Sequence, residues 1–490
     1  MDAVTLFRRA AARFGSRVAL EGPQGRQTFA QLEDRTNRLA HGLLGLGLRP
    51  GDRVLDLQPN QNTYIETDLA CMAAGLVRVA LNYRLHADDW DRIAADCDAC
   101  ALICDVSFAD RARSLREGLD VCVVVGDDYE RLLKTAPHGA LSTQSLVSLN
   151  YTSGTTGAPK GVRRAHSNRL ASLTNMSLDV LGGPPQPGDV YLHAAPVTHT
   201  SGLFTLPFLA AGAKQLILPS FDAEAVVDAV DNRGVTHTAV VPTMVARLLA
   251  LDSLDGLPGL KMLAYAGAPM PPEQIRLAHQ RVTPRLVQYY GLVEAIPPVT
   301  VLDADDHARG VDGEPDLLTS AGRACTLVDL RVVDDAGATL PAGEVGEVVT
   351  RGAHVMSGYW GSAGDVKAVR DGWLHTGDLG RLDESGRLWL VDRKGDMILT
   401  GAYNVYPSEV ERVVSEVPGV AEVAVYGVAD AEWGQRVTCA YTGTASPDDV
   451  AAHCARRLAS YKKPKQVRKL EAFPLNSTGK IDKKALSRDA

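Results

Sequence analysis

Residues 151–161 read Tyr-Thr-Ser-Gly-Thr-Thr-Gly-Ala-Pro-Lys-Gly and combine hydroxyl groups and glycines with one lysine, Lys160. Hydroxyls and unhindered backbone N–H groups can donate hydrogen bonds to phosphate oxygens, glycine lets the backbone approach them, and Lys160 adds a positive charge. The common phosphate loop has the order G-x-x-x-x-G-K-[ST], whereas here the lysine precedes the last glycine and Val162 follows. The segment therefore predicts a nucleotide site in an enzyme class other than the P-loop NTPases.

The same composition also occurs in ordinary linkers, so the flanking residues decide between the two interpretations. Residues 146–151 form an apolar run that is typical of a buried strand, and residues 167–172 can begin a helix. A strand–loop–helix setting favours a binding loop over a linker.

Composition excludes several classes of protein. A chain of 490 residues with 45% hydrophobic and 22% charged residues is typical of a globular protein with about two to four structural units. The net charge of −8 argues against a general nucleic-acid binder, which needs a basic surface. The longest apolar candidate, residues 203–213, ends at Lys214, and the N-terminal residues lack the apolar core of a secretory signal. We therefore expect no membrane span and a cytoplasmic location.

The eight cysteines are scattered, apart from Cys97 and Cys100, which form a C-x-x-C pair near Cys104. Such a pair can bind zinc or carry redox chemistry, but a second metal-binding pair is missing. The flanking residues predict a helix that runs into a strand at 101–104, so we interpret these cysteines as packing residues.

Strands and helices alternate along most of the chain. Helices are predicted over residues 5–19 and 63–75, and residues 26–33 are predicted to start a further helix. Strands are predicted at 51–57, 121–125, 215–218, 236–241 and 262–265. This alternation predicts a large N-terminal domain, residues 1–394, of layered α/β architecture.

Two further regions follow that α/β part. Short strands at 327–333, 346–350 and 388–391, separated by turns, predict a β-barrel-like subdomain over about 322–392. Residues 395–490 predict a small α+β C-terminal domain, in which a strand at 420–426 lies between helices at 408–416 and 448–459.

Several distant stretches together resemble the adenylate-forming superfamily of acyl-CoA synthetases, adenylation domains and luciferases, and most of all its acid–CoA ligases. The resemblance covers almost the full length. Seven motifs stand in the family's order: residues 151–161, Tyr290-Gly-Leu-Val-Glu294, Gly343-Glu-Val-Gly-Glu347, Thr376-Gly-Asp378, Arg393 with Asp396, Asn404-Val-Tyr-Pro-Ser-Glu409, and Ser477-Thr-Gly-Lys480. In this family ATP and a carboxylate give an acyl-adenylate and pyrophosphate, after which a thiol accepts the acyl group. The resemblance implies ATP, Mg²⁺ and CoA as cofactors and a small carboxylic acid as substrate.

The resemblance also implies a nucleotide site. The loop should hold the β- and γ-phosphates, Tyr290 or Tyr289 should lie near the adenine, and Asp378 and Arg393 should contact the ribose. The implied ATP- and AMP-binding residues are Thr152, Ser153, Gly154, Thr155, Thr156, Gly157, Lys160, Gly267, Ala268, Pro269, Tyr289, Tyr290, Gly291, Asp378 and Arg393.

Three residues are implied to be catalytic: Lys480, His199 and Glu294. A carboxylate that attacks the α-phosphate approaches a highly negative assembly, so a metal and fixed cations are needed to stabilise the transition state. The point charge of Lys480 can bridge the carboxylate and the α-phosphate, and Glu294 is expected to help coordinate Mg²⁺. His199 resembles the histidine that gates the acyl pocket, although a lone histidine beside apolar residues is also typical of a protein core.

The implied acyl pocket is mostly apolar. Residues 204–208, Phe-Thr-Leu-Pro-Phe, contain no acid where amino-acid-activating relatives place their amine-binding aspartate, so a free α-amino acid is a disfavoured substrate. The implied pocket residues are His199, Leu203, Val241, Tyr265, Ala266 and Val293.

The chain departs from the family pattern at three places. Val293 replaces a threonine and removes one hydroxyl. Gly395 stands at the expected hinge, where the family usually has lysine or aspartate, and glycine suits a pivot. The hinge should turn the C-terminal domain so that the thiol-tunnel residues Gly401, Ala402 and Tyr403 replace Lys480 at the site. Ala402 stands where the family often has a second glycine, and Ala402 and Tyr403 can narrow that tunnel, so an acceptor other than CoA is also possible.

The sequence thus leaves three functions. The first is an acid–CoA ligase for an aromatic or medium-chain acid. The second is an adenylating enzyme with another acceptor, namely a carrier-protein thiol, an amine, or nitrite that is activated for diazotisation of an aryl amine. The third is a non-catalytic nucleotide binder, which the presence of Lys160, Glu294, Asp378, Arg393 and Lys480 argues against.

Overall fold

The computed structural model describes residues 2–141, 146–152, 160–361, 368–400, 403–430, 433–475 and 481–488. The chain forms two compact units. The first comprises Met1–Leu330, Thr350–Leu374 and Gly386–Leu388, and the second comprises Arg331–Val349, His375–Ser385 and Trp389–Ala490. No helix in these described ranges is both long and apolar enough to cross a membrane.

The first unit contains a six-stranded sheet with the order β6-β5-β3-β4-β7-β8. Its strands are β3 (Arg53–Leu57), β4 (Val77–Ala80), β5 (Ala101–Asp105), β6 (Val121–Val125), β7 (Leu146–Thr152) and β8 (Lys160–Ala165). The first five strands of this order are parallel, and only β8 runs antiparallel to its neighbour β7. The strands predicted at 51–57, 101–104, 121–125 and 146–151 are therefore confirmed.

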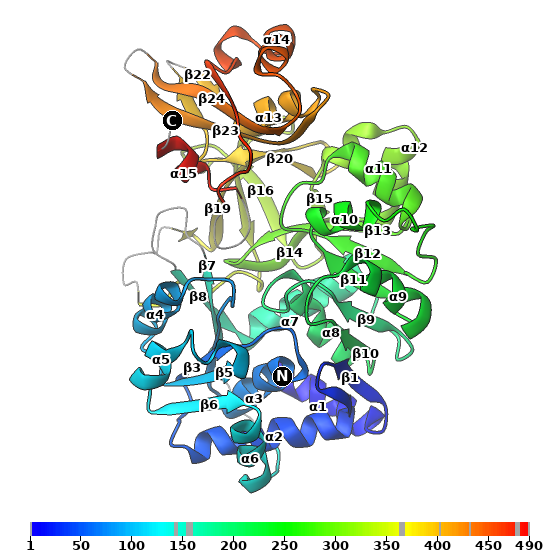
Figure 1. Ribbon diagram of the computed structural model, residues 1–490, viewed down its shortest axis with the longest axis vertical. Coiled ribbons are helices and arrows are strands. Elements are labelled where there is room, and N and C mark those ends of the chain that lie inside the picture. Colours follow the sequence, from blue (N-terminus) through cyan, green and yellow to red (C-terminus); the bar gives the residue numbers. More distant parts are fainter. Residues whose placement is uncertain are drawn as a thin grey trace. The chain divides into compact units, whose positions relative to one another are not determined.

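Helices cover both faces of this sheet (Figure 1). They are α2 (Phe29–Gly45), α3 (Asn62–Ala74), α4 (Ala87–Asp96), α5 (Arg113–Gly118) and α6 (Asp127–Thr135). Successive strand residues point to opposite faces. Leu55 and Leu102 pack in the layer that contains α4 and α5, whereas Val54 and Ile103 pack with α2, α3 and α6. Helix α3 is buried along its whole length, as expected for a helix that is covered on all sides.

The second sheet of the first unit has the order β15-β14-β13-β12-β11-β9-β10-β1-β2. Its strands are β1 (Val18–Gly22), β2 (Gly25–Thr28), β9 (Val190–His193), β10 (Lys214–Ile217), β11 (His237–Val240), β12 (Met262–Tyr265), β13 (Leu286–Leu292), β14 (Ala295–Leu302) and β15 (Gly322–Ala324). The strands from β13 to β1 in this order are parallel. The helices that connect or flank them are α1 (Ala3–Phe14), α7 (His166–Asn175), α8 (Thr205–Ala210), α9 (Ala223–Arg233), α10 (Pro242–Leu249), α11 (Pro272–Arg281) and α12 (Ala304–Asp312).

The second unit holds most of the hairpin region and the C-terminal part. The hairpin strands follow the order β16-β17-β19-β20, with β16 (Asp329–Val333), β17 (Gly346–Arg351), β19 (Trp373–Leu382) and β20 (Arg387–Arg393). The short strand β18 (Val369–Arg370) belongs to the first unit and pairs with the start of β19. A separate sheet has the order β22-β21-β24-β23, with β25 beside β24. The remaining elements are β21 (Ile398–Thr400), β22 (Tyr403–Val405), α13 (Pro407–Ser415), β23 (Val420–Asp430), β24 (Gly434–Gly443), α14 (Pro447–Arg457), β25 (Gln466–Lys469) and α15 (Lys483–Arg488). This arrangement is the α+β fold that the sequence predicted.

Two element boundaries near the N-terminus differ from the predictions. Helix α1 ends at Phe14 rather than near residue 19, because Ala19 belongs to strand β1. Strand β2 occupies Gly25–Thr28, so the second helix begins only at Phe29. Thr28 caps that helix: its hydroxyl accepts the N–H of Gln31 at 3.2 Å, and the Gln31 side chain accepts the N–H of Thr28 at 2.8 Å.

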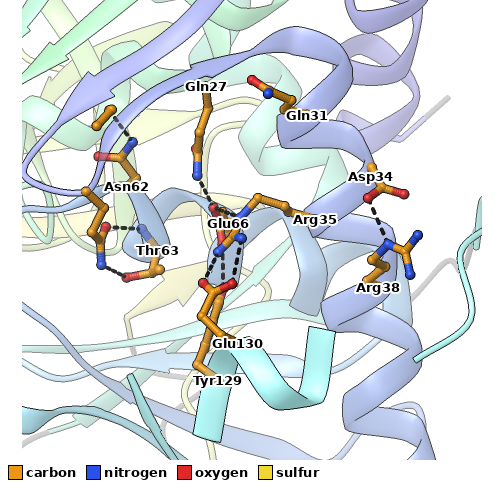
Figure 2. Close-up of polar contacts among 12 residues, drawn as sticks. Gln27, Gln31, Asp34, Arg35, Arg38, Asn62, Thr63, Glu66, Tyr129 and Glu130 are labelled. Carbon is orange, nitrogen blue, oxygen red and sulfur yellow. Dashed lines mark hydrogen bonds and ion pairs between the residues drawn. The ribbon is translucent and has the colours of Figure 1, made fainter. Parts of the chain in front are cut away.

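A buried carboxylate, Glu66, joins the helices below the six-stranded sheet (Figure 2). Its Oε1 accepts hydrogen bonds from Gln27 Nε2 at 2.6 Å and from Arg35 Nε at 2.7 Å, and its Oε2 accepts one from the Tyr129 hydroxyl at 2.8 Å. Arg35 also donates to Glu130 Oε1 at 2.6 Å. Strand β2 and helices α2, α3 and α6 therefore meet at one charge cluster.

Replacement of Glu66 by alanine should strongly destabilise the first unit. The substitution leaves Arg35, Gln27 and Tyr129 without their shared acceptor, and removal of one partner from a buried ion pair costs about 3–5 kcal/mol. Urea unfolding should show the loss as a lower midpoint. Glu117→Ala removes an exposed glutamate and serves as the control, with an expected change within about 0.5 kcal/mol. Equal losses in both variants would contradict the role of Glu66.

Candidate active site

The hydroxyl-rich segment joins two antiparallel strands. β7 ends at Thr152 and β8 begins at Lys160, and these two residues are partners in the ladder. Between them, the predicted phosphate ligands Ser153, Gly154, Thr155, Thr156 and Gly157 lie outside the described residues. The predicted strand–loop–helix setting is thus incomplete, since a second strand precedes helix α7. β8 pairs with β7 on one side, the N–H of Arg163 donates to the carbonyl of Gly358 at 3.0 Å on the other side, and Val162 is buried in the core.

Tyr359 connects the two charged residues predicted to act on ATP in the first unit. Its hydroxyl donates to Glu294 Oε1 at 2.9 Å, and Lys160 Nζ lies 5.0 Å from its ring centroid. Val162, which follows Lys160 on β8, forms a bridge with Tyr359. The structure therefore brings Lys160 and Glu294 to the same side chain. Sequence reasoning missed Tyr359, because no charge or spacing pattern marks it.

The two candidate adenine residues have different environments. Tyr289 and Tyr290 are neighbours on β13, so their side chains point to opposite faces. Tyr289 is 3% exposed, its hydroxyl donates to the carbonyl of Thr200 at 3.4 Å, and burial raises its pKa. Tyr290 is only partly buried. Tyr289 therefore belongs to the core, and Tyr290 is the partly accessible member of the pair.

The predicted turn 267–269 lies at the carboxyl edge of the second sheet. Gly267 follows β12 with φ +89°, a conformation that L residues rarely adopt, and Ala268 and Pro269 are exposed. Val241 and Pro196 follow the neighbouring parallel strands β11 and β9. Ligands of open α/β sheets bind beyond this edge of the strands.

His199 is exposed, which rules out the alternative that it is a core histidine. The core histidine of this region is His193, which bonds to Ser201 Oγ at 2.8 Å and Gln215 Oε1 at 2.7 Å, and whose pKa burial lowers to about 4. His199 and Leu203 line a cavity of about 80 Å³ in the first unit.

The other four predicted acyl-pocket residues do not line that cavity: Val241, Tyr265, Ala266 and Val293. Tyr265 is fully buried, and its hydroxyl is hydrogen-bonded to His307 Nε2 at 2.8 Å. Ala266 is also buried, whereas Val241 and Val293 are partly exposed. The structure therefore brings only two of the six predicted residues together on one cavity.

The two predicted ribose ligands lie together in the second unit. Arg393 Nε is 3.3 Å from Asp378 Oδ1, and Asp378 is 8% exposed. The backbone N–H of Asp378 donates to Thr376 Oγ1 at 3.1 Å, and the Thr376 hydroxyl donates to the carbonyl of Val348 at 2.7 Å. These bonds hold the backbone at Asp378 in the middle of strand β19. A carboxylate there has oxygens that can accept hydrogen bonds from a diol.

The predicted hinge and tunnel residues are only partly described. Gly395 lies in the turn between β20 and β21, outside the positive-φ region, and an added Cβ would meet no atom within 4 Å. Tyr403 is exposed on β22 and stacks on Tyr461 with ring centroids 4.5 Å apart. Gly401, Ala402 and Lys480 lie outside the described residues.

Within the described ranges, no group of three or more His, Cys, Asp or Glu residues could hold a metal ion. Cys97 and Cys100 are both free thiols, Cys97 is buried, and burial raises the pKa of Cys97 to about 12. Their arrangement agrees with a packing role.

Comparisons with protein families and curated proteins match nearly the whole chain. Residues 7–360 match the AMP-binding enzyme family, and residues 409–480 match the AMP-binding enzyme C-terminal domain. The feruloyl-CoA synthase of an Amycolatopsis species is 37% identical over 94% of this chain and 93% of its own length. The indoleacetate–CoA ligase of Aromatoleum aromaticum is 33% identical over 95% and 94% of the two chains.

Solved structures give the same result. An amide bond synthetase from Marinactinospora thermotolerans superposes with a TM-score of 0.89 at 31% identity, covering 100% of this chain and 99% of that one. The o-succinylbenzoate CoA synthetase of Bacillus subtilis, solved with its acyl-adenylate intermediate, has a TM-score of 0.89 at 28% identity, covering 98% and 97%. The same synthetase has also been solved with ATP and a magnesium ion, with a TM-score of 0.88 at 27% identity, covering 98% of each chain.

Tyr359→Phe should weaken Mg²⁺-dependent ATP binding. The substitution removes the hydroxyl that donates to Glu294 but keeps the ring beside Lys160. Loss of a group that orients a metal ligand costs about tenfold or more in metal affinity. The Mg²⁺ concentration for half-maximal ATP binding, measured by calorimetry, should rise accordingly. Tyr83→Phe, whose ring stacks on Phe108, is the control. An unchanged Mg²⁺ requirement in Tyr359→Phe would refute the role of this hydroxyl.

Proposed function

The chain belongs to the AMP-binding enzyme family and is an AMP-forming acid–thiol ligase, and from this membership we propose that it activates an aromatic or medium-chain carboxylic acid with ATP and transfers the acyl group to CoA. One observation carries the proposal: relatives that match over nearly the full length of both chains are named as CoA ligases. The feruloyl and indoleacetate enzymes are named for aromatic acids, which makes an aromatic acid the first choice.

The described site residues suit adenylation. We assign the phosphates to Lys160 and the adjoining loop, and the metal to Glu294. We assign the contact with the adenine to Tyr290, because the side chain of Tyr289 is buried in the core. Asp378 and Arg393 are assigned to the ribose, which the contact of 3.3 Å between them supports.

The reaction proceeds in two steps. The substrate carboxylate attacks the α-phosphate, an acyl–oxygen–phosphorus bond forms, and pyrophosphate leaves. The CoA sulfur then attacks the acyl carbon, a thioester forms, and AMP leaves. Glu294 would help to hold Mg²⁺, which when bound would supply positive charge to the phosphates. Lys160 and Lys480 add fixed positive charge where negative charge accumulates, which lowers the barrier of the first step.

The small domain is proposed to serve both steps. Lys480 acts in adenylation, and residues 400–403 replace it for thioester formation, with Gly395 as the pivot. The present conformation does not require glycine at residue 395, since its φ is not positive and a Cβ would fit. A need for glycine would therefore arise only in a second conformation.

A second candidate keeps adenylation but changes the acceptor to an amine. The similarity to an amide bond synthetase over the full chain favours it, as does the side chain of Tyr403 at the predicted tunnel. A carrier-protein thiol and nitrite are the other two candidate acceptors, and both can be tested in the assay described next.

Pyrophosphate–ATP exchange with a panel of acids tests the first step. An aromatic acid such as ferulate should support exchange, and CoA should then drive formation of AMP and thioester. Lys480→Ala should lower exchange by about 100- to 1,000-fold, as for other removed transition-state donors. It should affect thioester formation from supplied adenylate less. Lys484→Ala, an exposed lysine nearby, should stay close to wild type. Equal loss of both steps in Lys480→Ala would argue against its role, and AMP release driven by an amine but not by CoA would favour the second candidate.

Gly395→Ala tests the hinge. Because a methyl group fits here, the folded state should be unchanged or more stable by about 0.4–1 kcal/mol. Exchange should remain near the wild-type rate, whereas CoA-dependent product formation should fall by about threefold or more, because alanine restricts the pivot. Rapid-quench measurement of each step separates the two effects. Wild-type rates of both adenylation and thioester formation in Gly395→Ala would contradict the proposed role of Gly395 as the hinge.

A further inference from the structure

The cavity beside His199 is lined by charged and polar groups from five elements of the first unit. Helix α3 provides Asp68, β4 provides Arg78, β7 provides Ser148, β8 provides Arg164 and α7 provides Arg169. The segment that carries Thr198 and His199 completes the wall. Three guanidinium groups therefore line one small space, which is unexpected for a pocket that should hold an apolar acyl chain.

Two of these arginines form ion pairs with carboxylates. Arg78 Nη1 lies 2.9 Å from Asp68 Oδ1, and Arg78 Nε donates to Asp56 Oδ2 at 2.7 Å. Both terminal nitrogens of Arg169 donate hydrogen bonds to the carboxylate of Asp68, at 2.7 Å each. Asp56, Asp68 and Arg78 are buried. Two carboxylates thus neutralise two guanidinium groups.

Arg164 is the third guanidinium, and it has no carboxylate within ion-pair distance in the described part of the chain. Its Nη2 donates to the carbonyl of Val293 at 2.9 Å. Its Nε is shielded from solvent and finds no hydrogen-bond partner among the described residues. Burial and the nearby charge of Arg169 lower the pKa of Arg164 to about 9, against the effect of Glu294, so the group is still charged at neutral pH. The cavity wall therefore includes a charged guanidinium that forms no ion pair with any residue that the structure describes.

A second polar atom on the cavity wall also lacks a partner. The hydroxyl oxygen of Thr198 is buried and forms no hydrogen bond with any residue that the structure describes. Unpaired buried polar groups are costly, so two of them on one cavity call for an explanation. The nearby Ser148 hydroxyl already donates to Asn150 Oδ1 at 2.9 Å.

The size of the cavity restricts what can fill it. At about 80 Å³ it is about half the volume of an engineered cavity that accepts benzene. It can accept a group of three or four heavy atoms but no aromatic ring. Arg164 also lies four residues along β8 from Lys160, at the far end of the strand from the phosphate-binding loop, a separation of about 13 Å.

We propose that this cavity binds a compact, planar oxyanion of carboxylate or nitrite size, held by the guanidinium of Arg164 and the hydroxyl of Thr198, and distinct from the carboxylate that is adenylated. A guanidinium presents donors in a fixed fork that matches two oxygens of such an anion. The oxyanion can be a second carboxylate on the acid itself or a free small anion. The first source rests on the proposed function, whereas the second does not.

The test has two arms. In the first, sodium nitrite is titrated into the full-length protein by calorimetry, with chloride holding the ionic strength constant. In the second, pyrophosphate–ATP exchange compares 2-succinylbenzoate with 4-oxo-4-phenylbutanoate, which lacks the ring carboxylate. We expect binding in the first arm or a preference for the diacid in the second, and the arm that responds identifies the source.

Arg164→Met should weaken that binding or preference by about 10- to 100-fold, as for a lost hydrogen bond to a charged group. Arg163→Met is the matched control, because Arg163 is the exposed neighbour on the same strand; it should keep the wild-type value. Thr198→Val provides a second variant that does not remove charge, with an expected loss of about 3- to 10-fold.

The proposal is overturned if wild type shows neither nitrite binding nor a diacid preference, or if folded Arg164→Met and Thr198→Val both keep the wild-type values. A failure of every acid to support exchange, together with nitrite binding that depends on Arg164, would instead reject the proposed function and retain the oxyanion site.

Discussion

The complete burial of helix α3 is the constraint on which the first unit depends. The helix carries two buried acids, Glu66, which is fully shielded from solvent, and Asp68, which is 7% exposed. A buried carboxylate is tolerated only when cations and donors surround it, so each acid fixes its own set of partners. Glu66 gathers Arg35, Gln27 and Tyr129, and Asp68 gathers Arg78 and Arg169.

These two sets point in different directions. Residues two apart on a helix do not share a face, so Glu66 joins the helices beneath the six-stranded sheet, whereas Asp68 turns toward β4 and α7. The first set stabilises the fold, and the second set forms the wall of a cavity. Buried charged groups thus hold the layers together, and they also form the polar wall of the cavity beside His199.

The sequence was informative where local pattern decides structure. Apolar runs located β6 and β12 to the residue, and the order of seven motifs identified the family and the kind of reaction. Strand β8 was missed, because Lys160, Arg163 and Arg164 give its residues no strand-like pattern, and only pairing with β7 makes them a strand. Arg164 and Arg169 could not be recognised as cavity residues either. Their partners lie far away in the sequence, Val293 for Arg164 and Asp68 for Arg169, and basic residues are usually solvated. The sequence also could not show which of Tyr289 and Tyr290 is accessible to the adenine. That depends on which face of β13 is buried, and only the structure shows it.

The contact between Lys160 and the ring of Tyr359 has a consequence for nucleotide affinity. A flexible lysine that is ordered only when its ligand arrives loses side-chain freedom at that moment, at a cost of about 0.5–1.5 kcal/mol. Here the ammonium group already rests 5.0 Å from an aromatic centre whose hydroxyl is anchored on Glu294. Part of that entropy is therefore lost during folding, so Lys160 needs less further ordering in the phosphate-binding role that we propose for it.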